Sequence, residues 1–181
     1  MCTLTIHPLD DDGATVAMLA EILVQVVAGG GSVSFMHPLP VAEALTFWRH
    51  ALQAARRGER IVLGAWDGPL LAGTVTLLLD CPPNQPHRAE IAKLMTLPSH
   101  RGRGIALALM RRAEELARSH GKTLLVLDTA TEGGAGPLYE ALGYTLAGEI
   151  PHYALKPHGG LTGTRIYWKA IPGAIRSETP G

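Results

Sequence analysis

The sequence lacks an excess of charge of either sign, because its 181 residues include 16 basic and 16 acidic side chains. A domain that binds nucleic acid usually carries a strongly basic surface, so this balance argues against a nucleic-acid partner. The chain is 46% hydrophobic and 18% charged, the opposite of the composition that keeps a chain disordered. A chain of this length fits one domain. We therefore expect a single domain over residues 1–171, followed by a tail over 172–181.

Cysteine and long apolar runs are also scarce. Two cysteines, Cys2 and Cys81, are too few for a disulfide framework, and the eight histidines form no H-x-x-x-H pair or Cys/His cluster, so we expect no metal. No apolar run reaches the roughly 18 residues of a membrane span. Acidic residues at 10–12 precede the most apolar N-terminal stretch, where a signal peptide would carry positive charge. These absences predict a cytoplasmic protein without a membrane partner.

Hydrophobic periodicity predicts a mixed α/β fold. Apolar residues at helical spacing indicate four helices, and alternating or continuous apolar runs indicate seven strands. A strand, a glycine-bearing loop, a helix and another strand follow one another over residues 90–127, which implies one parallel pair in an otherwise antiparallel sheet. The predicted strands are 4–6, 60–66, 70–79, 90–97, 124–127, 144–150 and 164–168, and the predicted helices lie at 13–28, 41–57, 104–120 and 136–142.

The segment that carries most chemical information joins the strand ending at Thr96 to the following helix. Gly102 and Gly104 stand where the strand turns into the helix, and glycines there let backbone N–H groups converge on an anion at the helix N-terminus. Arg101 and Arg103 supply further donors for phosphate oxygens. The alternative is an ordinary strand-to-helix turn with solvated arginines beside it. The length of the whole pattern favours the anion site.

Two motifs resemble one protein family. The run from Arg101 to Ala106 is similar to the R/Q-x-x-G-x-G/A signature of the GNAT acetyltransferase superfamily, and residues 138–144 resemble its second hallmark. The order of elements from residue 4 to 168 also matches. Residues 89–95, 127–129 and 148–153 more narrowly resemble the tabtoxin-resistance type of small-molecule N-acetyltransferase.

The resemblance implies a GNAT-like fold and acetyl-CoA as co-substrate. Such a fold has a central mixed, mostly antiparallel sheet with one splayed parallel strand pair and helices on both faces. The pantetheine arm would bond to the backbone around residues 94–96, and the pyrophosphate would lie on the loop and first helical turn. The residues that this implies for cofactor binding are Leu94, Met95, Thr96, Arg101, Gly102, Arg103, Gly104, Ile105, Ala106 and Leu107.

Three side chains are candidates for the chemistry. An alkylamine has a pKa near ~10, so acetyl transfer needs a base or a water relay that removes a proton. The resemblance places Glu90 and Asp128 as base and amine ligand, and Tyr139 as the acid that protonates the leaving thiolate. Each residue also has a purely structural alternative. Glu90 would be an ordinary carboxylate at a strand edge, Asp128 would cap the following loop, and Tyr139 would be a packed aromatic side chain of its helix. One departure is Glu132, which replaces the family's usual pantetheine-binding asparagine.

The acceptor pocket is expected from two polar segments. Substrate-binding candidates are Ser32, Phe35 and Tyr153, with Ser34, His37 and His152 as further polar side chains. The predicted function is acetyl transfer to the primary amine of a small molecule, such as an amino-acid-like toxin, an antibiotic or a metabolite. Acetylation of a protein or peptide amine and a non-catalytic acyl-CoA sensor are the alternatives, and the sequence leaves a homodimer open.

Overall fold

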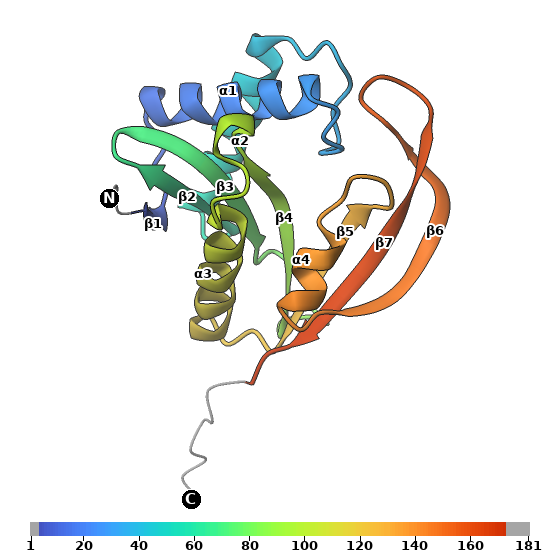
Figure 1. Ribbon diagram of the computed structural model, residues 1–181. Coiled ribbons are helices and arrows are strands. Elements are labelled where there is room, and N and C mark those ends of the chain that lie inside the picture. The colour runs from blue at the N-terminus through green and yellow to red at the C-terminus, as the bar shows by residue number, and fades with distance from the viewer. Residues whose placement is uncertain (1–3, 173–181) are drawn as a thin grey trace, which may run out of the picture.

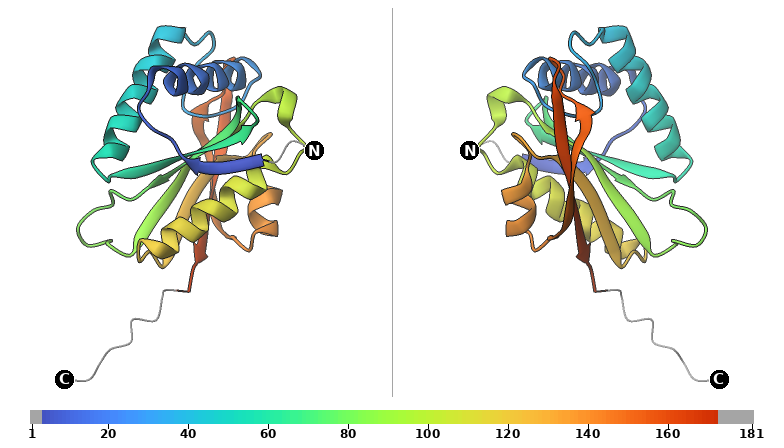
Figure 2. Two further views of the ribbon diagram at one scale, coloured as in Figure 1. Left: turned by 90° about the vertical axis from the view of Figure 1, so that its left-hand side faces the viewer. Right: turned by 90° about the vertical axis from the view of Figure 1, so that its right-hand side faces the viewer.

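The computed structural model describes residues 4–172, so Cys2 and all but the first residue of the predicted tail lie outside the described residues. A seven-stranded sheet in the order β1-β2-β3-β4-β5-β7-β6 forms its centre. Helices α1 and α2 cover one face, and α3 and α4 cover the other (Figures 1 and 2). The strands are β1 (Leu4–Pro8), β2 (Arg60–Asp67), β3 (Leu70–Leu78), β4 (Arg88–Thr96), β5 (Leu124–Ala130), β6 (Thr145–Leu155) and β7 (Leu161–Ala170). The helices are α1 (Gly13–Ala28), α2 (Val41–Arg56), α3 (Ile105–Ser119) and α4 (Gly136–Ala141), with a short 3₁₀ turn at Pro98–His100.

Local sequence explains where several elements begin and end. Asp12 caps α1, because its Oδ1 accepts hydrogen bonds from the backbone N–H groups of Ala14 and Thr15 at 3.0 and 2.9 Å. The Asp67-Gly68 pair lies in the turn between β2 and β3, which pair antiparallel. All neighbouring strands pair antiparallel except β4 and β5. The predicted mixed sheet with one parallel pair is confirmed.

The last two strands are longer than the sequence predicts. β6 continues past residue 150 to Leu155, and β7 begins at Leu161 rather than at Thr164. The expected loop therefore shrinks to residues 156–160. The predicted strand stops before Pro151. β6 is the edge strand of the sheet, and its residues 151–153 have no partner in β7, so the missing N–H of Pro151 removes no ladder bond. A register shift between Ile150 and Ala154 absorbs the irregularity.

The parallel pair separates part-way along its length. Only Arg88–Glu90 of β4 pairs with Leu124–Val126 of β5, although β4 runs on to Thr96 and β5 to Ala130. A bulge in β4 accompanies the separation, since its register with β3 shifts between Thr74 and Thr76. The two strands diverge visibly in Figure 1. The diverging edges leave room for a ligand inside the sheet.

The hydrophobic core has two parts, one on each face of the sheet. Leu109 of α3 is fully buried in the first cluster, and Trp48 of α2 is fully buried in the second. Both clusters include side chains from the central strands, so the sheet joins them. No helix within residues 4–172 combines the length and apolar character that a membrane span requires.

We expect Leu109→Ala to lower the free energy of unfolding by about 3 kcal/mol, because it leaves a cavity beneath α3. Leu146→Ala is the matched control, since Leu146 on β6 is 46% exposed, and its effect should stay within about 0.5 kcal/mol. Urea unfolding followed by circular dichroism measures both. Equal losses in the two variants would contradict the assignment of the core.

Candidate active site

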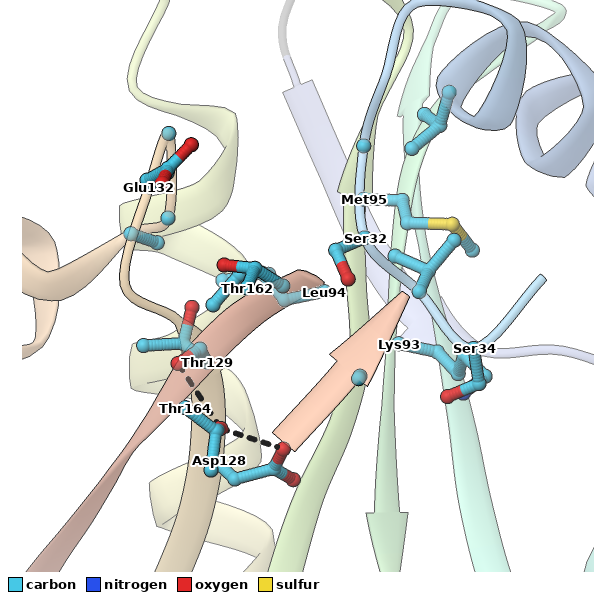
Figure 3. Close-up of a pocket in the computed structure, with 18 of the residues that line it drawn as sticks. Ser32, Ser34, Lys93, Leu94, Met95, Asp128, Thr129, Glu132, Thr162 and Thr164 are labelled. Carbon is cyan, nitrogen blue, oxygen red and sulfur yellow. Dashed lines mark hydrogen bonds between the residues drawn. The ribbon is translucent and has the colours of Figure 1, made fainter. Parts of the chain in front are cut away.

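A deep cleft occupies the gap between the separated strands. Its volume is about 800 Å³. One wall is the free edge of β4 from Ile91 to Thr96, and the other is the end of β5 with the loop before α4. The loop between α1 and α2 and the β6–β7 hairpin supply the remaining lining (Figure 3). The splayed pair is therefore the structural origin of the site.

A smaller hollow of about 200 Å³ adjoins the cleft at the N-terminus of α3. Gly102 and Gly104 line it with φ of +74° and +77°, a left-handed conformation that side chains with a Cβ rarely adopt. The first bond of α3 runs from the N–H of Ala108 to the oxygen of Gly104. Within the described chain, the N–H groups of residues 102–107 have no acceptor, and α3 has no side-chain cap. Such a set of unsatisfied donors is suited to an anion.

Two arginines flank this hollow in different ways. Arg101 lines both the hollow and the main cleft. Arg103 lines neither, and its Nη1 lies 3.6 Å from Oδ2 of Asp67 on β2. The Nε2 of His100 lies 3.5 Å from the same oxygen. Arg101 is therefore placed for an anion as it stands, whereas a phosphate contact by Arg103 stays a prediction.

The other residues predicted to hold the cofactor are distributed along the two hollows. Leu94, Met95 and Thr96 line the main cleft from the free edge of β4. The first turn of α3 lines the smaller hollow through Ile105, Ala106 and Leu107. Thr96 and Ala106 line both, so a single extended ligand can run from one into the other.

Tyr139 reaches the cleft from α4. It is 5% exposed, and the rings of Tyr144 and Tyr167 lie against it with centroids 5.9 and 5.8 Å away. Burial, and after it the charge of Asp128, raises the pKa of Tyr139 to about 12. The hydroxyl group therefore keeps its proton at neutral pH and can act as a proton donor in the cleft.

The two predicted carboxylates lie on the same face of the sheet but not equally near the cleft. Leu125 and Leu127 belong to the core beneath α3, so strand alternation turns Asp128 to the opposite face, where it lines the cleft. Its Oδ2 accepts a hydrogen bond from Oγ1 of Thr164 at 3.2 Å. Glu90 lies opposite Val126, is not among the lining residues and pairs with Arg88. The structure therefore brings Asp128, rather than Glu90, into the cleft.

Sequence reasoning missed Lys93. This residue lines the cleft from β4 with φ of +53°, and its Nζ donates a hydrogen bond to Oγ of Ser34 at 3.2 Å. Burial lowers the pKa of Lys93, and the charge of Asp128 partly offsets that effect. The available signal was a single cation in an otherwise apolar strand segment. Thr164 was missed as well, since nothing local marks it as the partner of Asp128.

The predicted acceptor residues divide into two groups. Ser32 and Tyr153 line the cleft, whereas Phe35 does not and packs edge-on against Phe47 with centroids 5.2 Å apart. The segment that carries Ser32 and Phe35 is tied to the β6–β7 turn. The N–H of His37 donates to the oxygen of Pro157 at 2.9 Å. The acceptor end of the cleft is thus bordered by two segments that hold each other in place.

Two further observations limit the chemistry of the site. Within residues 4–172, no group of three His, Cys, Asp or Glu side chains is arranged to hold a metal ion. Glu132, in the loop before α4, lines the cleft, and Nζ of Lys156 lies 3.0 Å from its Oε2. The position of the family's usual asparagine is therefore occupied by one half of an ion pair at the cleft rim.

Comparison with known families identifies the family to which this fold belongs. The acetyltransferase (GNAT) family matches residues 32–144. The chain belongs to the GNAT family.

Curated relatives of this GNAT protein match over part of their length. The chain is 36% identical to N-acetyltransferase 8F1 of Rattus norvegicus over 87 residues, which are 47% of this chain and 39% of the relative. It is 37% identical to N-acetyltransferase 8B of Homo sapiens over 81 residues, 44% of this chain and 36% of the relative. N-acetylaspartate synthetase of Rattus norvegicus is 33% identical over 91 residues, 50% of this chain and 30% of the relative. The chain thus spans less than half the length of these relatives.

Solved structures support the GNAT fold over nearly the whole chain. A putative acetyltransferase from Acinetobacter baylyi has a TM-score of 0.81 at 16% identity, covering 98% of this chain and 97% of that one. A putative acetyltransferase from Salmonella typhimurium, solved with its cofactor acetyl-CoA, has a TM-score of 0.76 at 18% identity, covering 98% and 99%. At these identities the likeness shows the fold alone.

The residues of this chain fit acetyl-CoA on their own geometry. The N–H groups of residues 102–107 offer donors for a pyrophosphate. The unpaired edge of β4 offers backbone groups for an extended amide-bearing arm, and the adjoining hollows give such a ligand a continuous path. A Cβ atom added at Gly102 or Gly104 would meet nothing within 4 Å, so the space above the loop is open.

We expect Gly104→Val to weaken CoA binding at least tenfold, because it strains the left-handed turn and places a branched side chain over the N–H groups. Gly121→Val is the matched control. Gly121 follows the other end of α3 with φ of +70° and an equally open Cβ position. A valine there introduces similar backbone strain away from the N–H groups of residues 102–107, which form the proposed phosphate cradle. Titration calorimetry with CoA measures both affinities. Equal affinities in the two variants would refute the phosphate cradle.

Proposed function

We propose that this GNAT enzyme moves the acetyl group of acetyl-CoA directly to the primary amine of a small molecule. The observation that carries this proposal is a pair of contacts between the two segments that border the predicted acceptor end of the cleft. His37 bonds to Pro157, and the ring of His158 lies 2.9 Å from the oxygen of Ala28. These contacts join the α1–α2 loop to the β6–β7 turn. An extended peptide needs an open groove, so the joined segments favour a compact acceptor.

One curated relative supports a small acceptor. The protein from Rattus norvegicus that matches half of this chain is named N-acetylaspartate synthetase, and its named product is an acetylated amino acid. The narrower resemblance to the tabtoxin-resistance type points in the same direction and stays a prediction, as does a role in toxin or antibiotic resistance. Acetylation of a protein amine is the second candidate.

The proposed chemistry assigns a task to each side chain in the cleft. Acetyl-CoA supplies an acetyl group activated as a thioester. Asp128 binds the ammonium form of the acceptor and, directly or through water, takes the proton that must leave before attack. The neutral amine then forms the new C–N bond while the C–S bond breaks, and Tyr139 donates its proton to the departing sulfur. The amide nitrogen loses its extra proton, directly or through water, to the Tyr139 phenolate, which restores the hydroxyl group. Cys81, in the loop after β3, does not line the cleft, and the proposed transfer uses no covalent enzyme intermediate.

Release of free CoA thiol across a panel of amines, amino acids and peptides tests the proposal. We expect turnover with at least one small amine and a lower kcat/KM for every peptide. Turnover with peptides alone would replace the small-molecule proposal by the protein candidate. Tight binding of acetyl-CoA without turnover on any acceptor would instead support a sensor.

We expect Tyr139→Phe to lower kcat by about 10²-fold, because it removes the proton donor, while the affinity for acetyl-CoA stays nearly the same. Tyr167→Phe is the matched control. Tyr167 is a buried tyrosine packed against Tyr139, and its hydroxyl group donates to Glu140 at 2.9 Å rather than reaching the cleft. Steady-state kinetics with saturating acetyl-CoA measures both. An unaltered kcat in Tyr139→Phe would end the acid assignment.

We expect Asp128→Asn to lower kcat/KM for the amine by about 10²-fold, and Glu90→Gln by less than tenfold. Each variant replaces one carboxylate on the same sheet face by its isosteric amide, but only Asp128 lines the cleft. The pH–rate profiles of both variants locate the group that accepts the proton. A wild-type profile in Asp128→Asn, with the acidic limb lost in Glu90→Gln, would restore Glu90 as the base.

A further inference from the structure

Lys93 is held in the cleft by an unusual backbone. It lies in the bulge of β4, where the register with β3 shifts, and bulges re-aim a side chain. Three non-glycine residues in the described chain have positive φ, and two of these, Ser34 (75°) and Lys93 (53°), contact each other across the cleft wall. Backbone strain from a positive φ at a non-glycine residue persists mainly at functional sites, where the surrounding structure fixes the direction of the side chain.

The surroundings of Lys93 hold its ammonium group without neutralising it. Its Nζ lies 5.9 Å from the ring centroid of Phe35 and 5.7 Å from that of Phe47, within the range of cation–π attraction. Ser34 is its hydrogen-bond acceptor. No carboxylate of the described chain lies within 4.0 Å of the group, whereas Lys156 and Lys169 each have such a partner. Among the described residues, Lys93 is therefore a cation in the cleft without a carboxylate in contact with it.

Asp128 is the complementary case on the opposite wall. Its carboxylate accepts a hydrogen bond from Thr164, and within residues 4–172 no cation lies within 4.0 Å of it. Figure 3 shows Lys93 with Ser34 on one side of the cleft and Asp128 with Thr164 on the other. The two charges face one cleft but do not neutralise each other by contact. A ligand with both a cationic and an anionic group complements them at once.

We propose that the acceptor is a small amine that also carries a carboxylate, which binds Lys93 and Ser34 while the amine lies at Asp128. The Ser34 hydroxyl accepts from Lys93 and retains its own hydrogen for a carboxylate oxygen. Burial lowers the pKa of Lys93, and a bound carboxylate restores the charge that burial disfavours. This inference rests on the acetyl transfer proposed above and specifies its substrate class: free amino acids and similar amino acid-like molecules.

The test compares each amino acid with the amine that lacks only its carboxylate, in wild type, Lys93→Met, Lys93→Arg and Lys156→Met. Methionine keeps the length of the side chain and its packing on the two rings without the charge. We expect wild type to prefer the amino acid at least tenfold in kcat/KM, and Lys93→Met to lose that ratio. Lys93→Arg should retain most of it. Lys156→Met removes a positive charge at the rim of the cleft, from a residue that does not line it, and should retain the full preference.

Binding without turnover separates this inference from the proposed function. Calorimetric titration of the same pairs into the enzyme saturated with CoA measures the carboxylate preference directly. A preference that is lost in Lys93→Met, without thiol release from acetyl-CoA, supports the carboxylate site and refutes the transferase proposal. Equal affinity for amino acid and amine, or a preference that survives in Lys93→Met, overturns the carboxylate site. Mass-spectrometric detection of acetyl-Lys93 after incubation with acetyl-CoA alone also overturns it, because acetylation removes the charge.

Discussion

The loss of pairing between β4 and β5 is the constraint on which the rest of the site depends. Parallel strands normally continue their ladder to the end, but here the ladder stops after Glu90 and Val126. The free edge of β4 keeps backbone donors and acceptors that no strand of this chain satisfies, and a ligand with extended amides can take that place. Two helices also begin close to the gap, because α3 follows β4 and α4 follows β5. One irregularity in the sheet thus brings together the N-terminus of α3, Tyr139 and the segments proposed to bind the acceptor.

The electrostatics of the site follow from which charges find partners. The chain is neutral as a whole, and several charged side chains around the cleft are paired, namely Glu90 with Arg88, Arg103 with Asp67 and Glu132 with Lys156. Paired charges have little capacity left for a ligand. Among the described residues, the groups that retain such capacity are Arg101 and the N–H donors at the start of α3, with Lys93 and Asp128 in the cleft. A neutral chain can therefore present a strongly polar site.

Local patterns in the sequence were sufficient to propose the residues of the cofactor half of the cleft, and the structure places most of these residues along the two hollows. Gly102 and Gly104 could be assigned because a strand-to-helix turn is contiguous in sequence, and Tyr139 because it lies in a short helix with its own hallmark. Partners that are distant in sequence could not be assigned. Asp67 reaches Arg103 through the β2–β3 turn, and the direction of Lys93 depends on a bulge that only the pairing with β3 reveals. The length of β6 was underestimated because its place at the sheet edge is a property of the topology.

The proposed cofactor half of the cleft is formed by contacts that are local in sequence, whereas the proposed acceptor half is formed by contacts between distant segments. The donor half is built from one segment and its helix, so a family pattern carries its chemistry from protein to protein. The acceptor half is built where the α1–α2 loop, the bulge of β4 and the β6–β7 hairpin meet. None of these contacts is contiguous in sequence, and each can change while the donor half stays constant. Acceptor specificity in this chain must therefore be derived from its own charges, above all from Lys93 and Asp128, rather than from the family to which it belongs.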